Sequence, residues 1–150
     1  MKVISHRGNI NGVDQSKEND PSYIDLALES YEVEIDIRIV KNEFMLGHDL
    51  GQYLVTKDWL QDRAKKLWVH CKDYQSFSSL SETNIKAFYH SVEPCVAVRN
   101  SSLIWCHHLP DADHNSIVPL LDANSLLLRK SLNRGNGVGA ICSDYPSQIK

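Results

Sequence analysis

Residues 33–40 have the sequence VEIDIRIV, and this stretch decides the fold. Its apolar and charged residues alternate with the period of a β-strand, which places Glu34 and Asp36 on one face and Val33, Ile35 and Ile37 on the other. Two carboxylates on the interior face of an apolar strand repel each other and lose hydration, so a cation is expected between them. A hard divalent ion with oxygen ligands fits this demand, and Mg²⁺ or Ca²⁺ fits better than Zn²⁺.

Further short apolar runs of strand length lie on both sides of this stretch. They cover residues 3–6, 44–48, 67–71, 87–90, 96–98, 103–107, 117–121 and 138–142. Helix-like segments cover residues 21–30, 57–65, 76–86 and 123–132. The first of these helices is expected to begin at Asp20-Pro21, an N-cap followed by proline.

Strands that alternate with helices predict an α/β protein with parallel strands joined by crossovers. Lys41-Asn42-Glu43 is a tight connector that predicts a hairpin between 33–40 and 44–48, and residues 133–137 predict a loop before the last strand. A full eight-fold βα barrel usually needs about 200 residues or more, and residues 87–121 leave no room for helices. We therefore expect a compact, abbreviated TIM (β/α) barrel whose middle crossover helices are reduced to loops.

The composition is that of an ordinary globular chain: 150 residues with 42% hydrophobic and 23% charged residues predict one domain over 1–150. The net charge of −3 and the absence of a basic run predict no nucleic-acid partner. The start MKVISHRG lacks the apolar core of a signal peptide, and no later stretch is long enough to span a membrane. A cytoplasmic location is therefore expected, and the sequence carries no signal for an oligomeric state.

Four cysteines, Cys71, Cys95, Cys106 and Cys142, lie far apart and form no CxxC pair. Three of them lie in apolar strand-like runs. We expect all four to be buried reduced thiols, because a free cysteine packs as a small apolar residue.

Ionisable residues stand at the C-terminal ends of several apolar runs. Parallel-barrel enzymes place their active sites at the C-terminal ends of their strands. His6 and His48 can act as an acid/base pair, since an imidazole pKa near 6.5 suits proton transfer at neutral pH. Arg7 and Lys72 can bind phosphate oxygens, the guanidinium as a fork and the ammonium as a point charge.

These motifs resemble the glycerophosphodiester phosphodiesterase family. The resemblance is carried by His6-Arg7-Gly8, Glu18-Asn19, Glu34-x-Asp36 and Gly47-His48-Asp49, in the family's order and with similar spacing. Residues 67–72 resemble the family's third strand, and residues 139–146 resemble the end of its last strand. The likeness is closest to a short bacterial subgroup of the family.

The resemblance implies a βα barrel in which His6 and His48 are the acid/base catalysts and Glu34 and Asp36 bind a divalent metal, Mg²⁺ or Ca²⁺ with Mn²⁺ as an alternative. In the family, a hydroxyl next to the phosphodiester attacks phosphorus, expels the alcohol and leaves a cyclic phosphate that water opens. Glu18 would be a further acidic neighbour of the metal, and Asn19 would fix its loop.

His70 stands where the family usually has a third metal-binding carboxylate. An imidazole there either binds the metal, favouring ions such as Mn²⁺ or Zn²⁺, or contacts the phosphate. The metal site is therefore expected to consist of Glu34, Asp36 and His70.

Other histidines and aromatic residues have two interpretations each. His90 either faces the same barrel mouth or is structural. A second group forms either a solvated loop or part of the substrate pocket, and its members are His107, His108, Asp111, Asp113 and His114. Trp68, Tyr89 and Trp105 are expected in the core, unless one stacks on the substrate at the mouth.

The leading hypothesis is thus a metal-dependent hydrolase of small glycerophosphodiesters. One alternative is phospholipase D-like or lyase-type cleavage that stops at the cyclic phosphate. The other is a barrel that binds a phosphorylated sugar or glycerol unit without turnover, which the intact pair His6 and His48 argues against.

Overall fold

A computed structural model describes residues 1–128 and 137–149, and its sheet grows outward from the strand that carries Glu34 and Asp36. This strand, β2 (Glu32–Val40), pairs in parallel with β1 (Lys2–His6) and with β5 (Leu67–Cys71). The C-terminal half of β2 forms an antiparallel hairpin with β3 (Glu43–Leu46). The turn residues Lys41 and Asn42 both have positive φ, 50° and 66°, as a tight hairpin turn requires, so the predicted hairpin is confirmed.

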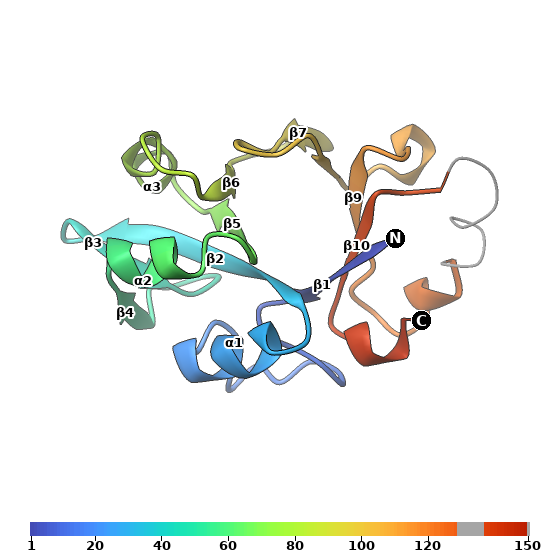
Figure 1. Cartoon of the computed structure of the whole chain (residues 1–150), viewed down its shortest axis with the longest axis horizontal. Helices are drawn as coiled ribbons and strands as arrows, with labels where there is room; N and C mark the ends of the chain where they lie inside the picture. Colours follow the sequence, from blue (N-terminus) through green and yellow to red (C-terminus); the bar gives the residue numbers. More distant parts are fainter. Residues whose placement is uncertain (129–136, 150) are drawn as a thin grey trace.

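The remaining strands continue the sheet on both sides and curl it (Figure 1). They are β4 (Tyr53–Val55), β6 (Lys86–Phe88), β7 (Cys95–Ala97), β8 (Ile104–Cys106), β9 (Ser116–Pro119) and β10 (Ala140–Ser143). β10 pairs in parallel with both β1 and β9, and an antiparallel bridge between Ala87 and Arg99 connects β6 to the segment after β7. The fold is a mixed α/β structure whose curled sheet is consistent with a partial barrel.

The α-helices lie on the outer side of the N-terminal part of the sheet (Figure 1). They are α1 (Pro21–Leu28), α2 (Lys57–Asp62) and α3 (Tyr74–Ser79). Asp20 caps α1 by accepting hydrogen bonds from Ser22 N and Tyr23 N, as expected. Between β6 and β10 the helices of the described residues are the 3₁₀ turns η1 (Leu109–Asp111) and η2 (Ser125–Leu128), and η3 (Pro146–Gln148) follows β10. The expectation that the middle crossovers are reduced to loops is confirmed.

Three sequence expectations need correction. The helix expected over 76–86 lies at Tyr74–Ser79, because Asp73 accepts a hydrogen bond from Ser76 N and starts the helix there. The run at 96–98 forms a strand that is antiparallel to β8, whereas a parallel strand was expected. The helix expected over 123–132 is the 3₁₀ turn η2 within the described part; its remainder, and residues 133–136 of the predicted loop, lie outside the described residues.

The described residues form three buried apolar clusters, which pack on the two faces of the sheet. On its outer face Val33, Ile35, Ile37, Leu67 and Val69 pack with the residues of the helices. On its inner face Ile4, Trp68, Phe88, Trp105 and Ile117 pack against one another. Because side chains alternate along each strand, Glu34, Asp36 and His70 lie on the inner face, beside this second cluster.

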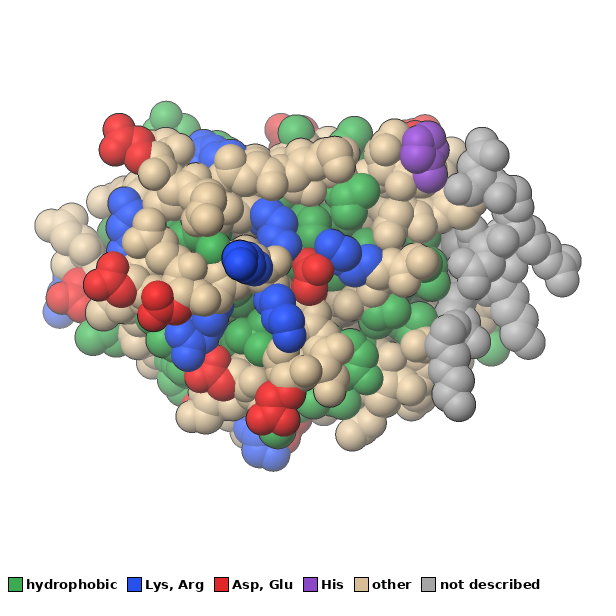
Figure 2. Space-filling view, viewed as in Figure 1, with side chains coloured by type: hydrophobic (Ala, Val, Ile, Leu, Met, Phe, Trp, Pro, Cys, Tyr) green, Lys and Arg blue, Asp and Glu red, His purple; other side chains and the backbone are tan. Residues whose placement is uncertain are grey.

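Ion pairs lie at the opposite end of the strands from His6. Glu32 accepts contacts from Lys2 at 2.8 Å, from Lys86 at 3.0 Å and from the Trp68 indole at 2.6 Å. Figure 2 shows Lys and Arg side chains gathered near the middle of one face of the molecule, around an acidic side chain. Charged groups thus cover the inner apolar cluster at this end, which leaves the other end for the predicted site.

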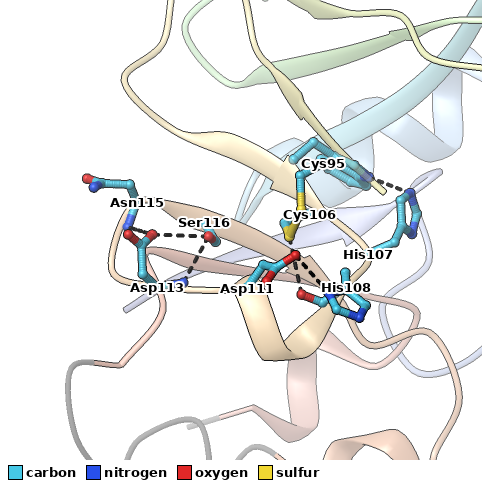
Figure 3. Close-up of a disulfide and its surroundings, with 9 residues drawn as sticks. Cys95, Cys106, His107, His108, Asp111, Asp113, Asn115 and Ser116 are labelled. Carbon is cyan, nitrogen blue, oxygen red and sulfur yellow. Dashed lines mark hydrogen bonds and ion pairs between the residues drawn. A yellow bond between two sulfur atoms is a disulfide. The ribbon is translucent and has the colours of Figure 1, made fainter. Parts of the chain in front are cut away.

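The prediction of four reduced cysteines is wrong for one pair. Cys95 and Cys106, on the antiparallel strands β7 and β8, form a disulfide (Figure 3), while Cys71 and Cys142 are free and buried. Strand pairing places Cys95 directly opposite Cys106, a contact that the sequence spacing did not indicate. No helix among the described residues is both long and apolar enough to cross a membrane.

We predict that the chain, purified without reductant and unfolded, exposes two reactive thiols, those of Cys71 and Cys142. Reduction before unfolding should raise the number to four, because it opens the Cys95–Cys106 disulfide. Titration with a chromogenic thiol reagent in denaturant measures both states. Four thiols before reduction would show that the cysteines are all reduced, as the sequence alone suggested.

Candidate active site

The predicted site residues meet at the carboxyl ends of the parallel strands. Strand register places His6 beside Glu34 on β1 and β2, and Asp36 beside His70 on β2 and β5. His6, Glu34 and Asp36 are all buried. The residues that the sequence marked as strand ends therefore converge on one point of the inner face.

The turn after β1 sends the Arg7 side chain towards the carboxylates. Arg7 and Gly8 have positive φ, 55° and 91°, and a side chain at Gly8 would lie 2.9 Å from the Tyr23 ring. Arg7 Nε lies 2.7 Å from Asp36 Oδ2, and Arg7 Nη1 lies 3.1 Å from Glu18 Oε2. The guanidinium is thus an ion-pair partner of two carboxylates and is fixed beside the site.

Asn19 holds Asp36 in place from the opposite side. It is buried, has a φ of 62°, accepts a hydrogen bond from Asp36 N at 2.9 Å and donates one to Asp36 Oδ2 at 3.2 Å. Asp36 Oδ2 is therefore occupied by Arg7 and Asn19, whereas Oδ1 has no hydrogen-bond partner within residues 1–128 and 137–149. Asn19 was expected to fix its loop, and it also orients the carboxylate.

The two carboxyl groups differ in their affinity for a proton. Burial, and then the charge of Asp36, raise the pKa of Glu34 to about 7. Burial would raise the pKa of Asp36 as well, but the nearby His70 ring and the positive charge of Arg7 hold it well below its usual range. With no cation between them, Glu34 is the member of the pair that takes up a proton.

Glu34, Asp36 and His70 offer three ligand atoms that lie within 4.8 Å of one another. His70 Nδ1 is 3.2 Å from Asp36 Oδ1 and 3.8 Å from Glu34 Oε1, and the buried atoms Glu34 Oε2 and Asp36 Oδ1 have no hydrogen-bond partner. Unpaired carboxylate oxygens in a buried site are what a divalent cation satisfies. The residues present therefore fit the metal that the sequence predicted.

Stacked rings fix the orientation of His70. Its imidazole lies between Phe88 and His90, with ring centroids 4.8 and 4.9 Å away and planes within 8° and 5° of parallel. Burial lowers the pKa of His70, which keeps the ring neutral and able to offer a lone pair. His90 thus holds a predicted site residue in position, and both of its own ring nitrogens are buried without a hydrogen-bond partner.

Asp144 contacts His6 and was not identified as a site residue from the sequence. Its Oδ1 lies 2.7 Å from His6 Nδ1, while His6 Nε2 lies 3.8 Å from Glu34 Oε2. Burial alone would lower the pKa of His6, but the hydrogen bond with Asp144 and the charges of Glu34 and Asp144 outweigh it and raise the pKa. The sequence could have indicated Asp144 by its position directly after the last strand, because His6 and His48 were identified from similar positions at strand ends.

Asn9 connects this part of the site to the Arg7 side. Its Nδ2 donates to Asp144 Oδ1 at 2.7 Å and to Glu18 Oε1 at 2.9 Å. Glu18, expected as a further acidic neighbour of the metal, contacts Arg7, which in turn contacts Asp36, and it also lies in a second group with His6 and Asp144. Asp144 is paired with His6 and Asn9, and Glu18 is paired with Arg7 and Asn9. We therefore assign the second group to a hydrogen-bond network.

His48 lies in the loop after β3 and faces the candidate site from there. Gly47, at a φ of 143°, allows a tight bend in which a Cβ would collide with Leu50 O. His48 Nδ1 lies 2.7 Å from Asp49 Oδ1, and its side chain is 43% exposed. One histidine of the predicted pair is therefore buried, and the other stands at the solvent boundary.

A cavity of about 250 Å³ joins these groups, and we call it the inner cavity. It is lined by His6, Arg7, Glu34, His48, His70, Lys72, His90, Trp105, His107, Pro119 and Leu121. Lys72 Nζ lies 3.7 Å from Asp36 Oδ1. Imidazole, cationic and carboxylate side chains thus line one small space together with the apolar residues Trp105, Pro119 and Leu121.

The histidines after β8 separate into two environments (Figure 3). His107 accepts a hydrogen bond from the Trp105 indole at 3.0 Å and lines the inner cavity. His108 pairs with Asp111 at 2.8 Å in an exposed loop, and Asp113 accepts from Asn115 N. His114 is exposed. His107 thus lies beside the cavity, whereas His108 and His114 lie on the exposed surface, and a role in substrate binding stays a prediction.

The chain was compared with models of known protein families, with curated proteins and with solved structures, and none of them matches.

We predict that Glu34 makes the metal-free protein less stable as the pH rises. Its pKa is about 7 in the folded chain against 4.5 ordinarily, so its contribution to stability is complete below pH 4.5 and is lost as the pH rises through 7. In wild type the free energy of unfolding should fall by an amount on the order of 1–3 kcal/mol over this pH range. Glu34→Gln cannot titrate, so this fall should be absent from the variant. Urea unfolding in EDTA at several pH values measures it, with exposed Glu43→Gln as the control. An unchanged pH slope in Glu34→Gln would contradict the assignment.

We also predict that Asp144→Ala lowers the pKa of His6. The hydrogen bond and the negative charge of Asp144 raise this pKa against burial, so their loss lets burial dominate. An NMR titration of the His6 ring measures the pKa, with Asp144→Asn as a variant of matched size and exposed Asp58→Ala as the control. The same His6 pKa in wild type and both Asp144 variants would disprove the pairing.

Proposed function

We propose that this chain is a metal-dependent phosphodiesterase of the glycerophosphodiester phosphodiesterase type, built on an abbreviated βα barrel. The observation that carries the proposal is the convergence of Glu34, Asp36 and His70 beside one cavity that His6 and His48 also line. A protein that only binds phosphate needs no acid/base pair. Two buried carboxylate oxygens, Glu34 Oε2 and Asp36 Oδ1, have no hydrogen-bond partner among the described residues, whereas buried polar atoms of structural clusters generally have one.

In this reaction His6 is the base. The Nδ1 of His6 is engaged by Asp144, so Nε2 is the atom that takes the proton from the substrate hydroxyl next to phosphorus. That hydroxyl oxygen then forms a bond to phosphorus as the bond to the leaving alcohol breaks. His48, as imidazolium, gives its proton to the departing oxygen, and water opens the cyclic phosphate in a second stage.

Cationic side chains bind the phosphoryl group. Lys72 reaches the inner cavity as a point charge, and Arg7 retains N–H donors beyond the two nitrogens that contact Asp36 and Glu18. A divalent ion, Mg²⁺, Ca²⁺ or Mn²⁺, held by Glu34, Asp36 and His70 would supply further positive charge for the phosphoryl oxygens. Asn19 and His90 keep two of these ligands in place.

The test is hydrolysis of glycerophosphodiesters with Mg²⁺, Mn²⁺ or Ca²⁺, followed by ³¹P NMR. We expect metal-dependent turnover that falls by about 10²–10⁴-fold in His6→Ala and in His48→Ala, and a loss of metal dependence in Glu34→Ala. Exposed His114→Ala is the matched control and should keep wild-type activity. A product that remains a cyclic phosphate would assign lyase-type cleavage.

Folded protein that turns over no such diester with any of these metals would overturn the proposal. Folding is checked independently by circular dichroism of each variant. Binding of glycerol phosphate without turnover would then favour the non-catalytic alternative.

A further inference from the structure

The Cys95–Cys106 disulfide joins the open end of the hairpin formed by β7 and β8, opposite its turn (Figure 3). Cys95 begins β7 and Cys106 ends β8. One step further out, His107 N donates a hydrogen bond to Pro94 O at 2.7 Å. His107 lines the inner cavity, so the disulfide lies directly beside the point at which the hairpin enters the cavity wall.

We propose that this disulfide is a redox-sensitive switch. Thiol–disulfide exchange with a dithiol reductant opens it, and its opening releases His107 from its place in the wall of the inner cavity. The oxidised form is the one with the ordered wall. The effect of the switch on turnover rests on the proposed function, whereas the switch itself rests on the geometry of the hairpin.

The open end of the hairpin depends on few other contacts among the described residues. β7 and β8 have three residues each, and β7 stands at the end of the sheet, where β8 is its one partner among the described strands. β8 pairs with β9 through Ile104 and Trp105, a register that ends before Cys106. Isolated two-stranded hairpins are marginally stable in water. The covalent link is therefore well placed to order Cys106 and the residue that follows it.

Contacts from His107 lead to the candidate metal site. Its Nε2 accepts a hydrogen bond from the Trp105 indole at 3.0 Å. The Trp105 ring stacks on Phe88 with centroids 4.5 Å apart, and Phe88 stacks on His70 at 4.8 Å. The His107 ring also lies 5.3 Å from that of His90, which covers the other face of His70. A change in the position of His107 thus reaches both rings that hold His70.

The two bonded cysteines differ in their access to a reductant. Cys95 is half-buried, whereas Cys106 is 1% exposed. An incoming thiolate therefore attacks Cys95 Sγ, the S–S bond breaks, and Cys106 leaves. The second thiolate of the reductant then displaces Cys95 and closes the reductant's own disulfide, so two electrons and two protons pass to the protein. In the reduced form the Cys106 thiol has His108 O, 3.4 Å away, as an acceptor.

The other two cysteines stay outside this exchange. Cys71 and Cys142 are free and fully buried. Burial raises the pKa of Cys71 to about 12 and that of Cys142 well above its usual range, and the thiolate is the form that exchanges with disulfides. Reduction of the folded protein is thus confined to Cys95 and Cys106.

The test compares oxidised wild type, wild type treated with dithiothreitol, and the double variant Cys95→Ser/Cys106→Ser, which has no disulfide. A thiol reagent should find no reactive thiol in the folded oxidised protein and two after reduction. Dithiothreitol should change nothing in the double variant, which also controls for any effect of the reagent on a metal ion.

Hydrogen exchange followed by NMR measures the order of the wall. The His107 amide should exchange about tenfold faster or more in the reduced protein and in the double variant, because local opening becomes easier. The Tyr31 amide, bonded to Ala27 O just beyond α1, is the internal control and should keep its rate.

The same His107 exchange rate in oxidised and reduced wild type, or a folded protein whose disulfide dithiothreitol does not open, would disprove the switch. The two redox states of wild type decide this even if the double variant does not fold. The proposed function adds that reduction lowers kcat/KM for a glycerophosphodiester severalfold, and equal turnover in both states would overturn this link to the site. Absence of turnover in both states would count against the proposed function, while the His107 amide still decides the switch.

Discussion

The structure depends on the burial of two carboxylates on the inner face of β2. Glu34 is 1% exposed and Asp36 is 0% exposed, and a buried carboxylate without partners is strongly destabilising. Arg7 and Asn19 hold one oxygen of Asp36, and His70 and Lys72 approach the other. The turn after β1, the left-handed Asn19 and the ring stack on β5 and β6 can each be understood as a means of holding these partners in place.

Such an arrangement is typical of a site selected for chemistry. Replacement of a buried ion pair by apolar residues is often neutral or stabilising, so the stability of the fold alone gives no reason to retain the pair. The inner apolar cluster beside it, with Trp68, Phe88 and Trp105, shows that these strands can fill the interior without charge. Their burial is consistent with the cation site that we propose.

Much of the fold and part of the site could be predicted because they follow from local patterns. Alternation along residues 33–40 sets which face Glu34 occupies, and the Asp20 cap and the Lys41-Asn42 turn act within a few residues. Strand ends then indicated where the histidines would gather. The start of α3 was also available, since Asp73 is a standard N-cap residue.

The remainder could not be predicted because it depends on contacts between distant segments. The antiparallel direction of β7 and the Cys95–Cys106 disulfide arise from how the chain returns after β6. The contacts of Glu18 with Arg7 and Asn9 likewise depend on tertiary packing. Strand periodicity does not report which partner a side chain meets across the sheet.

The pairing of β1 with β10 has a consequence for how the protein matures. His6 lies on the first strand and its partner Asp144 follows the last one, 138 residues later in the chain. During synthesis the imidazole emerges early but lacks its carboxylate until the final strand docks in parallel beside β1. The proposed metal ligands on β2 and β5 can assemble before that moment, so the proposed site is completed last, by the strand that joins β1 to β9.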